Sequence, residues 1–216
     1  MVLRRGTVSG HNQSVATSGY GTPSLLESIG RETYLMSFFV GAYWGVREER
    51  REACAERIAA FLLSVSTLDV ALAQWYKQTA SRRKAQTAIS TDQHSIQSLL
   101  STNKTDIGKT TIPELGFSFS VENRDRVWLQ ATVGAFHPRI SNAVVVTFSM
   151  EKTTPKLELL QGLVHSAVNA FDPDHAAAFS RDVFRGVQGQ PLLQRPAVYR
   201  YVKSVGFSAA DLLYLK

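Results

Sequence analysis

The sequence predicts an α+β protein whose mainly antiparallel sheet has helices packed on one face. Two observations lead to this prediction. Apolar residues recur at helical spacing in the first half of the chain, and they alternate with polar residues in the second half. Helical and extended segments are thus partly segregated, as is typical of α+β folds. Residues 1–31 are rich in Ser, Thr and Gly and are expected to form a disordered tail, whereas residues 32–216 are expected to form a single domain.

The first half is expected to begin with one strand and to continue with helices. Residues 33–43 are aromatic and β-branched, which predicts a strand. Residues 47–66 predict a helix, because five apolar side chains fall on one face: Cys54, Ile58, Phe61, Leu62 and Val65. A second helix is expected to run to Tyr76 from a cap at Thr67 or Asp69. A short third helix is expected over residues 92–101, capped by its first residue.

The second half is expected to supply most of the sheet. A helix from about Pro155 to Phe171 interrupts the strands, since its apolar residues recur on one face. The run 143–150 is continuously apolar, which is typical of a central strand, and residues 123–125 predict a turn. Strands are predicted in five places, the last two as short edge strands: 115–122, 127–133, 143–150, 176–179 and 197–205.

Composition and charge exclude several classes of protein. The 24 Lys and Arg exceed the 18 Asp and Glu by only six, a modest excess for a nucleic-acid groove. Cys54 is the one cysteine, so an internal disulfide is excluded, and its apolar neighbours indicate a packed side chain rather than a nucleophile. The longest apolar run, residues 34–45, is too short to span a bilayer. Because no secretory signal pattern is present, we expect a cytoplasmic protein.

Two short clusters resemble a phosphate-binding loop and a metal site, and each lacks residues that its chemistry requires. Residues 103–110 resemble a phosphate-binding loop but begin with Asn where the mechanism needs Gly. Residues 172–175 gather two carboxylates and an imidazole, yet no second pair of ligands follows, and Asp-Pro is typical of a helix end. We therefore expect no enzyme, no catalytic residue, no metal and no cofactor, although an active site assembled from distant residues stays open.

Charged side chains suggest two alternative binding surfaces. Glu48, Glu52 and Glu56 recur every four residues and predict an acidic row on the first helix, which is either a plain solvent face or a site for a cationic partner. A basic surface would instead indicate a small nucleic-acid-binding module, although aromatic side chains that could stack on bases are few. Its residues would be Lys77, Arg82, Arg83, Lys84, Lys104, Lys109, Arg181, Arg185, Arg195, Arg200 and Lys203.

The segment Val40-Gly41-Ala42-Tyr43-Trp44-Gly45-Val46-Arg47-Glu48, running into Glu52-Ala53-Cys54-Ala55, resembles the immunity protein 52 family. These proteins are antidotes encoded beside bacterial polymorphic toxins, particularly toxins with a restriction-endonuclease-like nuclease domain. Three further segments fit the resemblance in the right order: Trp75-Tyr76, residues 112–117 and residues 168–174. The resemblance covers roughly residues 33–180 and becomes vague beyond Gly186.

The resemblance implies a non-enzymatic protein that binds and neutralises a cognate toxin, expected to be a nuclease from the adjacent gene, in a stoichiometric complex. Contact with a membrane or directly with nucleic acid is not expected. Tyr43 and Trp44 are expected to be anchors if they face solvent, and to be core residues otherwise. The full set of expected toxin-facing residues is Tyr43, Trp44, Glu48, Glu52, Glu56 and Glu114. A small basic nucleic-acid-binding module is the alternative function.

Overall fold

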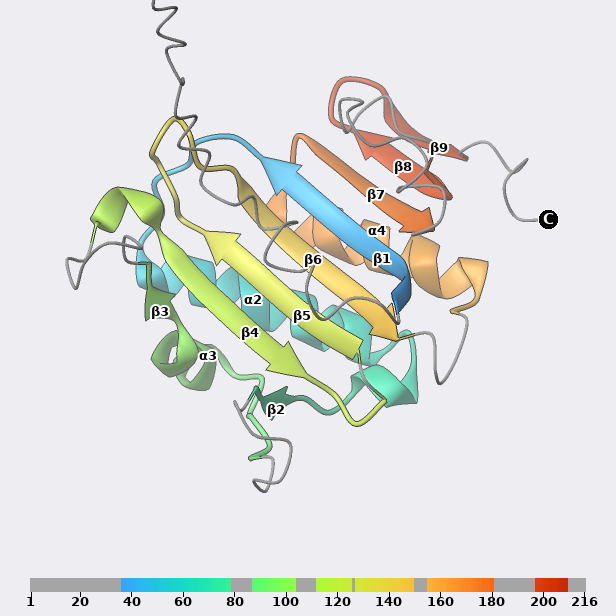
Figure 1. Cartoon of the computed structure of the whole chain (residues 1–216), viewed down its shortest axis with the longest axis horizontal. Coiled ribbons are helices and arrows are strands. Elements are labelled where there is room, and N and C mark those ends of the chain that lie inside the picture. The colour runs from blue at the N-terminus through green and yellow to red at the C-terminus, as the bar shows by residue number, and fades with distance from the viewer. Residues whose placement is uncertain are drawn as a thin grey trace, which may run out of the picture. The chain divides into compact units, whose positions relative to one another are not determined.

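The computed structural model describes residues 36–78, 87–103, 112–125, 127–149, 155–180 and 197–209. All of them belong to one compact unit. One antiparallel sheet has the strand order β2-β4-β5-β6-β1-β7-β8-β9, and β3 also pairs with β4 (Figure 1). The strands are β1 Met36–Trp44, β2 Tyr76–Lys77, β3 Ser101–Thr102, β4 Phe117–Glu122, β5 Val127–Val133, β6 Asn142–Ser149, β7 His175–Ser180, β8 Tyr199–Val202 and β9 Gly206–Ala209.

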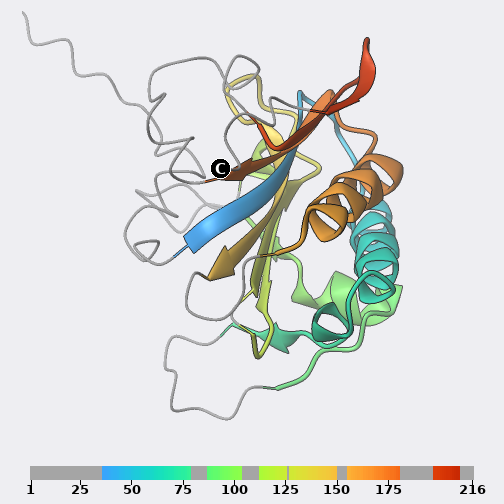
Figure 2. The ribbon, with the colours of Figure 1, turned by 90° about the vertical axis from the view of Figure 1, so that its right-hand side faces the viewer.

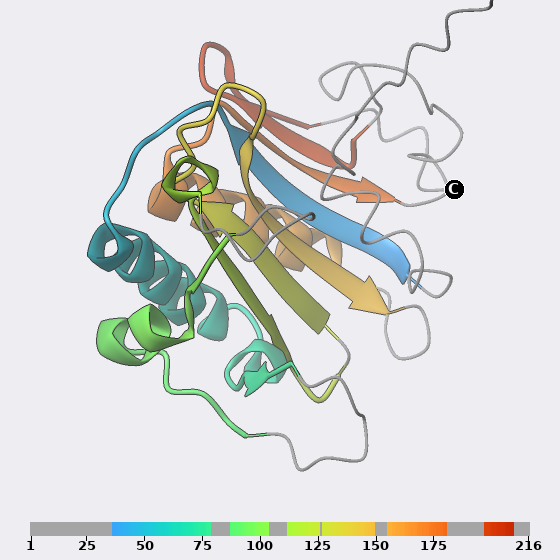
Figure 3. The same ribbon diagram turned by 60° about the vertical axis from the view of Figure 1, so that its left-hand side comes forward.

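The helices lie together on one face of this sheet (Figure 2), which confirms the predicted α+β class. Among the described residues the α-helices are α2 Arg51–Ser66, α3 Gln93–Leu99 and α4 Leu157–Phe171. The same part of the chain also has the 3₁₀ turns η1 Val70–Leu72 and η2 Pro113–Leu115. Helices α2 and α4 run beside each other (Figure 3), and the Oγ atoms of Ser64 and Ser166 lie 2.8 Å apart between them. No helix among the described residues is long and apolar enough to cross a membrane.

Strand β1 lies in the middle of the sheet, between β6 and β7. Its residues Val40, Ala42 and Trp44 point to the helix side and join the main core, as the two-residue period of a strand requires. Every residue of β6 is buried, which confirms the predicted central strand. On the other face of the sheet, a smaller apolar cluster forms around Phe179.

The predicted helical stripes are confirmed. All five apolar residues expected on one face of α2 are buried, and Leu160, Val164 and Phe171 of α4 are buried beneath the sheet. Asp92 caps α3 by accepting a 2.9 Å hydrogen bond from the backbone N–H of Ser95. Helix α4 ends at Asp172, which adopts a left-handed conformation with φ of 46°. The cluster at 172–175 therefore contains a helix end, as its Asp-Pro pair predicted.

Four sequence predictions about the elements are wrong. The edge strand expected over 197–205 is the shorter β8 followed by a turn, and β8 is not at an edge because β7 and β9 pair with it on either side. The helix expected to reach Tyr76 is only the turn η1, because Tyr76 pairs with Glu122 at the sheet edge; Asp69 does cap that turn. Strand β7 is not at an edge, since β1 and β8 pair with it on either side. Helix α2 begins at Arg51 rather than at residue 47, so Glu48 lies in the preceding loop. Residues 1–31, the expected tail, lie outside the described residues.

Candidate functional site

Four connections gather at one end of the sheet, at the top of Figure 1. They are residues 45–50 between β1 and α2, 134–141 between β5 and β6, 172–174 between α4 and β7, and 203–205 between β8 and β9. We call this set the loop platform. Its members are far apart in the sequence and are brought together because β1, β6, β7 and β8 are neighbours in the sheet. Loops that a rigid sheet holds in place are the usual location of binding residues.

Hydrogen bonds fix the first of these loops to its neighbours. The backbone N–H of Gly45 donates to Asp174 Oδ2 at 2.9 Å, and the Gly45 carbonyl accepts from Asn142 Nδ2 at 2.7 Å. The backbone N–H of Arg47 donates to the Ala135 carbonyl at 2.9 Å. Both sides of loop 45–50 are therefore bonded to other loops of the platform, so the loop has a defined conformation before any partner arrives.

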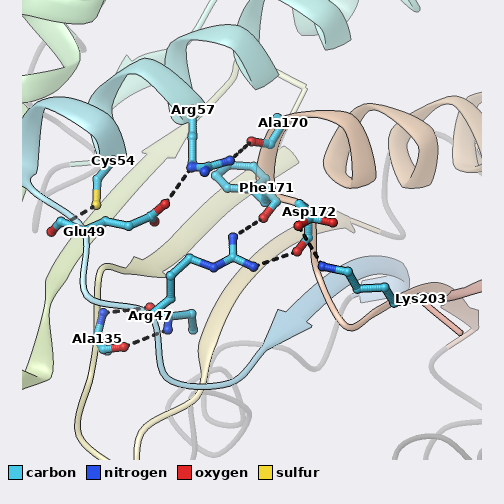
Figure 4. A network of polar contacts seen from close by, with 10 residues as sticks. Arg47, Glu49, Cys54, Arg57, Ala135, Ala170, Phe171, Asp172 and Lys203 are labelled. Atoms are coloured by element: carbon cyan, nitrogen blue, oxygen red, sulfur yellow. Dashed lines mark hydrogen bonds and ion pairs between the residues drawn. The ribbon is translucent and has the colours of Figure 1, made fainter.

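Two arginines join the same loop to the end of α4 (Figure 4). The Arg47 guanidinium donates to the carbonyls of Phe171 and Asp172 at 2.6 and 2.8 Å. Arg57, on α2, donates to the Ala170 carbonyl at 3.0 Å and to Glu49 Oε1 of the loop at 2.8 Å. The last carbonyls of a helix have no partner within the helix and carry partial negative charge, so cations bind well there. The platform is thus built partly on the C-terminal end of α4.

The turn between β8 and β9 joins the platform through Lys203. Its backbone N–H donates to the Asp174 carbonyl at 2.9 Å, and its ammonium lies 2.7 Å from Asp172 Oδ2. The hydrogen bond from Lys203 holds the pKa of the Asp172 carboxyl below its usual value. Both side chains of this ion pair are about half exposed, so the pair serves to position the turn more than to stabilise the fold.

Asn142 is the buried link within the platform. Its side-chain amide donates to the carbonyls of Gly45 and Ala135, at 2.7 and 2.9 Å, and its Oδ1 accepts from the Ala135 N–H at 2.8 Å. We expect Asn142→Ala to lower the free energy of unfolding by about 2 kcal/mol, because the buried N–H and carbonyl of Ala135 lose their side-chain partner. Urea unfolding would measure the loss. Asn169→Ala, at an exposed position on α4, is the control, and equal stability of the two variants would contradict the role of Asn142.

A concave pocket of about 470 Å³ lies beside the platform. Its apolar lining comes from Pro113, Phe117 and Phe136, and Glu48, Glu49 and Arg50 add charges of both signs. Glu114 follows Pro113 in η2, and its carbonyl accepts hydrogen bonds at 3.0 Å from the N–H groups of residues 136 and 137. Of the predicted interface residues, the pocket is therefore lined by Glu48, while Glu114 is the chain neighbour of a lining residue.

The other two predicted acidic residues lie further along α2. Glu52 and Glu56 are exposed, and Glu52 is engaged with α3: its Oε1 accepts from Gln97 Nε2 at 2.7 Å and its carbonyl accepts from Gln93 Nε2 at 3.1 Å. Because Glu48 precedes the helix, the three glutamates do not form the continuous helical row that their spacing suggested. All three are exposed, Glu48 in loop 45–50 and the other two on α2.

Tyr43 and Trp44 were expected to be either solvent-facing anchors or core residues, and the structure shows that they are core residues. They are 9% and 3% exposed, and their rings stack on His175 and Phe171 at centroid distances of 5.2 and 5.4 Å. In this conformation neither side chain reaches solvent as an anchor would. Both instead support the platform from below, because they immediately precede Gly45.

Two exposed apolar residues of the platform were missed by the sequence analysis. Val46 is 58% exposed and Val205 is 77% exposed. Each valine lies in a connection and is adjacent in sequence to a glycine, Gly45 for Val46 and Gly206 for Val205. This adjacency is the one sequence signal that could have indicated exposed valines there. An apolar side chain held in solvent by an ordered loop is a common feature of binding surfaces.

The other candidate sites gain little support from the described residues. Lys77 lies in β2 and Lys203 is paired with Asp172, while most of the predicted basic surface lies outside the described residues: Arg82, Arg83, Lys84, Lys104, Lys109, Arg181, Arg185 and Arg195. Within the described part of the chain, no three His, Cys, Asp or Glu side chains are grouped to hold a metal. Burial, together with the Glu49 carboxylate, raises the pKa of the Cys54 thiol to about 12, so this thiol stays protonated at neutral pH.

A family model described as Immunity protein 52 matches residues 33–195 of the chain. Among curated proteins no match is found. The matched segment contains three of the four platform loops, and it ends before β8 begins at Tyr199.

Proposed function

The chain belongs to the immunity protein 52 family, and from this premise we propose that it binds and neutralises a cognate polymorphic toxin in a stoichiometric complex. We further propose that this toxin is a nuclease with a restriction-endonuclease-like domain, encoded by the adjacent gene, and that the chain itself catalyses no reaction. The observation that supports the proposal is the family match over residues 33–195, which spans every strand from β1 to β7 and the three α-helices.

We place the toxin interface on the loop platform and the pocket beside it. Glu48 is exposed and lines the pocket. Glu114 lies in η2, directly after Pro113, which also lines the pocket. The Phe117 ring already faces the Arg51 guanidinium, whose Cζ lies 5.0 Å from the ring centroid. A Lys or Arg side chain of the toxin could lay its aliphatic stem on Phe136 and place its charge near Glu48. Glu52 and Glu56 would extend the acidic surface along α2, while Tyr43 and Trp44 would act from beneath as supports.

The hydrogen bonds within the platform support this placement energetically. Ordering a mobile loop on binding costs free energy that is subtracted from the affinity. Loop 45–50 is already held by bonds from Gly45, Arg47 and Asn142, so little ordering would remain to be done. The exposed acidic side chains would then steer a cationic partner and favour one orientation.

Co-expression with the toxin domain of the adjacent gene tests the proposed function. We expect cells that make both proteins to survive, and the two proteins to purify together as a complex of fixed stoichiometry, measured by light scattering. A catalytically inactive toxin variant allows the affinity to be measured in the same system. Cell death without any complex, with active toxin and folded immunity protein present, would contradict the proposal.

Reversing the charge at Glu48 tests the proposed interface. Glu48→Lys should weaken toxin binding by about tenfold or more, because a cation would then face the cationic surface of the partner. Calorimetry at two salt concentrations would measure the change. The matched control is Glu158→Lys, exposed in the first turn of α4, about 20 Å from the end of α4 that meets the platform. Equal affinities of the two variants would place the interface elsewhere without affecting the proposed function.

A further inference from the structure

The hairpin formed by β8 and β9 extends the sheet beyond the part of the chain that the family model matches. The match ends at residue 195, and the hairpin begins at Tyr199. Strand β8 pairs with β7 along four residues, so the hairpin continues the same sheet and ends the strand order at β9. Features shared by the family therefore do not account for the side chains that this hairpin presents.

The hairpin exposes apolar side chains at the end of the sheet where the platform lies. Val205 in its turn is 77% exposed, and Phe207 in β9 is 41% exposed. Figure 2 shows the turn projecting beyond the neighbouring loops. The bonds of Lys203 to Asp172 and Asp174 join this turn to the rest of the platform. The apolar surface of the hairpin is therefore continuous with the proposed toxin interface.

Aromatic contacts hold Phe207 in place although it is partly in solvent. Its ring stacks on His165 of α4 with centroids 4.0 Å apart, and it lies 4.9 Å from the ring of Tyr201 and 6.0 Å from that of Tyr199. His165 Nε2 and the Tyr199 hydroxyl form a hydrogen bond of 2.9 Å. Rigid, partly exposed aromatic side chains lose little entropy on binding, which is why they are enriched among the residues that dominate interfaces.

The hairpin and the pocket side of the platform differ in character. Residues 197–209 contain Arg200 and Lys203 and no acidic residue, but the Lys203 ammonium is paired with Asp172, so exposed apolar side chains are the main feature of the hairpin. The pocket is instead lined by charges of both signs, Glu48, Glu49 and Arg50. Two surfaces of different character favour one orientation of a partner and disfavour partners with a different pattern.

We propose that the β8–β9 hairpin is a second contact surface for the cognate toxin and selects it from related toxins. The surface would receive an apolar patch of the toxin on Val205 and Phe207. This proposal rests on the proposed function, because the partner is the toxin that the chain neutralises. The family-matched loops would supply the common part of the interface, and the hairpin would supply the part particular to this chain.

The test compares Val205→Asp with Val70→Asp in binding to the catalytically inactive toxin domain of the adjacent gene. Val70 is 89% exposed in η1, where α2 ends away from the platform, so it matches Val205 in residue type and exposure. We expect Val205→Asp to weaken binding by about tenfold or more and Val70→Asp to change it by less than about twofold. Thermal unfolding of both variants should resemble that of the unchanged protein.

Hydrogen exchange of the unmodified protein gives a second measurement that needs no substitution. We expect the amides of residues 199–209 to exchange more slowly in the complex than in the free protein. Two outcomes would overturn the hairpin proposal while the unmodified protein binds tightly: unchanged exchange of these amides, or equal affinities of the two variants. Either outcome would leave the proposed function intact. An unmodified protein that does not bind the toxin would overturn both proposals.

Discussion

Gly116→Ala is expected to lower the free energy of unfolding by about 4 kcal/mol, which is a large part of the stability of a typical domain. Gly116 connects η2 to β4 with φ of 68° and ψ of −147°, a conformation that essentially only glycine adopts. An added Cβ would lie 2.5 Å from the backbone N of Ala135 and 2.8 Å from the carbonyl carbon of Gly134. Because these neighbours are backbone atoms, no side-chain rotation can relieve the overlap.

Urea unfolding followed by circular dichroism would measure this loss. Gly162→Ala in α4 is the control, since an added Cβ there meets only the end of the flexible Leu68 side chain, nearest at 2.8 Å. Alanine favours a helix over glycine by about 1 kcal/mol, so the control should retain most of its stability. If the two variants unfolded at the same urea concentration, the strained connection at Gly116 would not be essential.

Phe171→Ala is expected to cost a similar amount, about 4 kcal/mol, because it would leave a large cavity in the core. Phe171 is fully buried at the end of α4, where its ring lies 5.4 Å from that of Trp44 and 5.6 Å from that of Phe61. It therefore joins β1, α2 and α4. The backbone carbonyl of the same residue accepts from Arg47 and is kept in the variant, but a shift of the α4 end into the cavity would move it and loosen loop 45–50.

The measurement combines chemical unfolding with toxin binding. Phe171→Leu keeps most of the volume and should cost about 1 to 2 kcal/mol, with little effect on affinity. Phe171→Ala should lose stability and also affinity, because a loosened loop must be ordered again on binding. A loss below about 1 kcal/mol in the alanine variant would contradict the central position of this ring in the core.

Much of the fold could be predicted because the relevant signals are local. The stripe from Cys54 to Val65 follows the 3.6-residue period of a helix, and β6 has an unbroken apolar run from Ala143 to Val146. The caps at Asp69 and Asp92 depend only on residues two or three positions further along. Such features need no knowledge of distant segments.

The errors arose where distant segments decide the structure. Trp75 and Tyr76 have spacing suitable for a helix, but Tyr76 is extended because β4, more than forty residues later, offers it a partner. The position of β7 within the sheet depends on β1 on one side and β8 on the other, and neither pairing has a local signal. Tertiary pairing therefore overrode the local pattern in both places.

The arrangement of the candidate site could not be predicted, and the role of its residues at an interface stays a prediction. Glu48 and Glu114 were both expected at the interface, but whether η2 comes near loop 45–50 depends on tertiary packing, which places Pro113 and Glu48 around one pocket. Tyr43 and Trp44 could be read either as anchors or as core, because a sequence of aromatic residues does not say which face of a strand is covered. Val46 and Val205 were missed because a single valine beside a glycine is common in any chain.

The platform also bears on the order of events during synthesis. Its bonds join Gly45 to Asp174 across 129 positions of the chain and Arg47 to Phe171 across 124. Strand β1 likewise cannot pair until β6 and β7 have been synthesised, and both follow it by more than ninety residues. Contacts of such long range form late and make folding slow. A nascent or truncated chain therefore lacks the platform, and protection of the cell would begin only when synthesis of nearly the whole chain is complete.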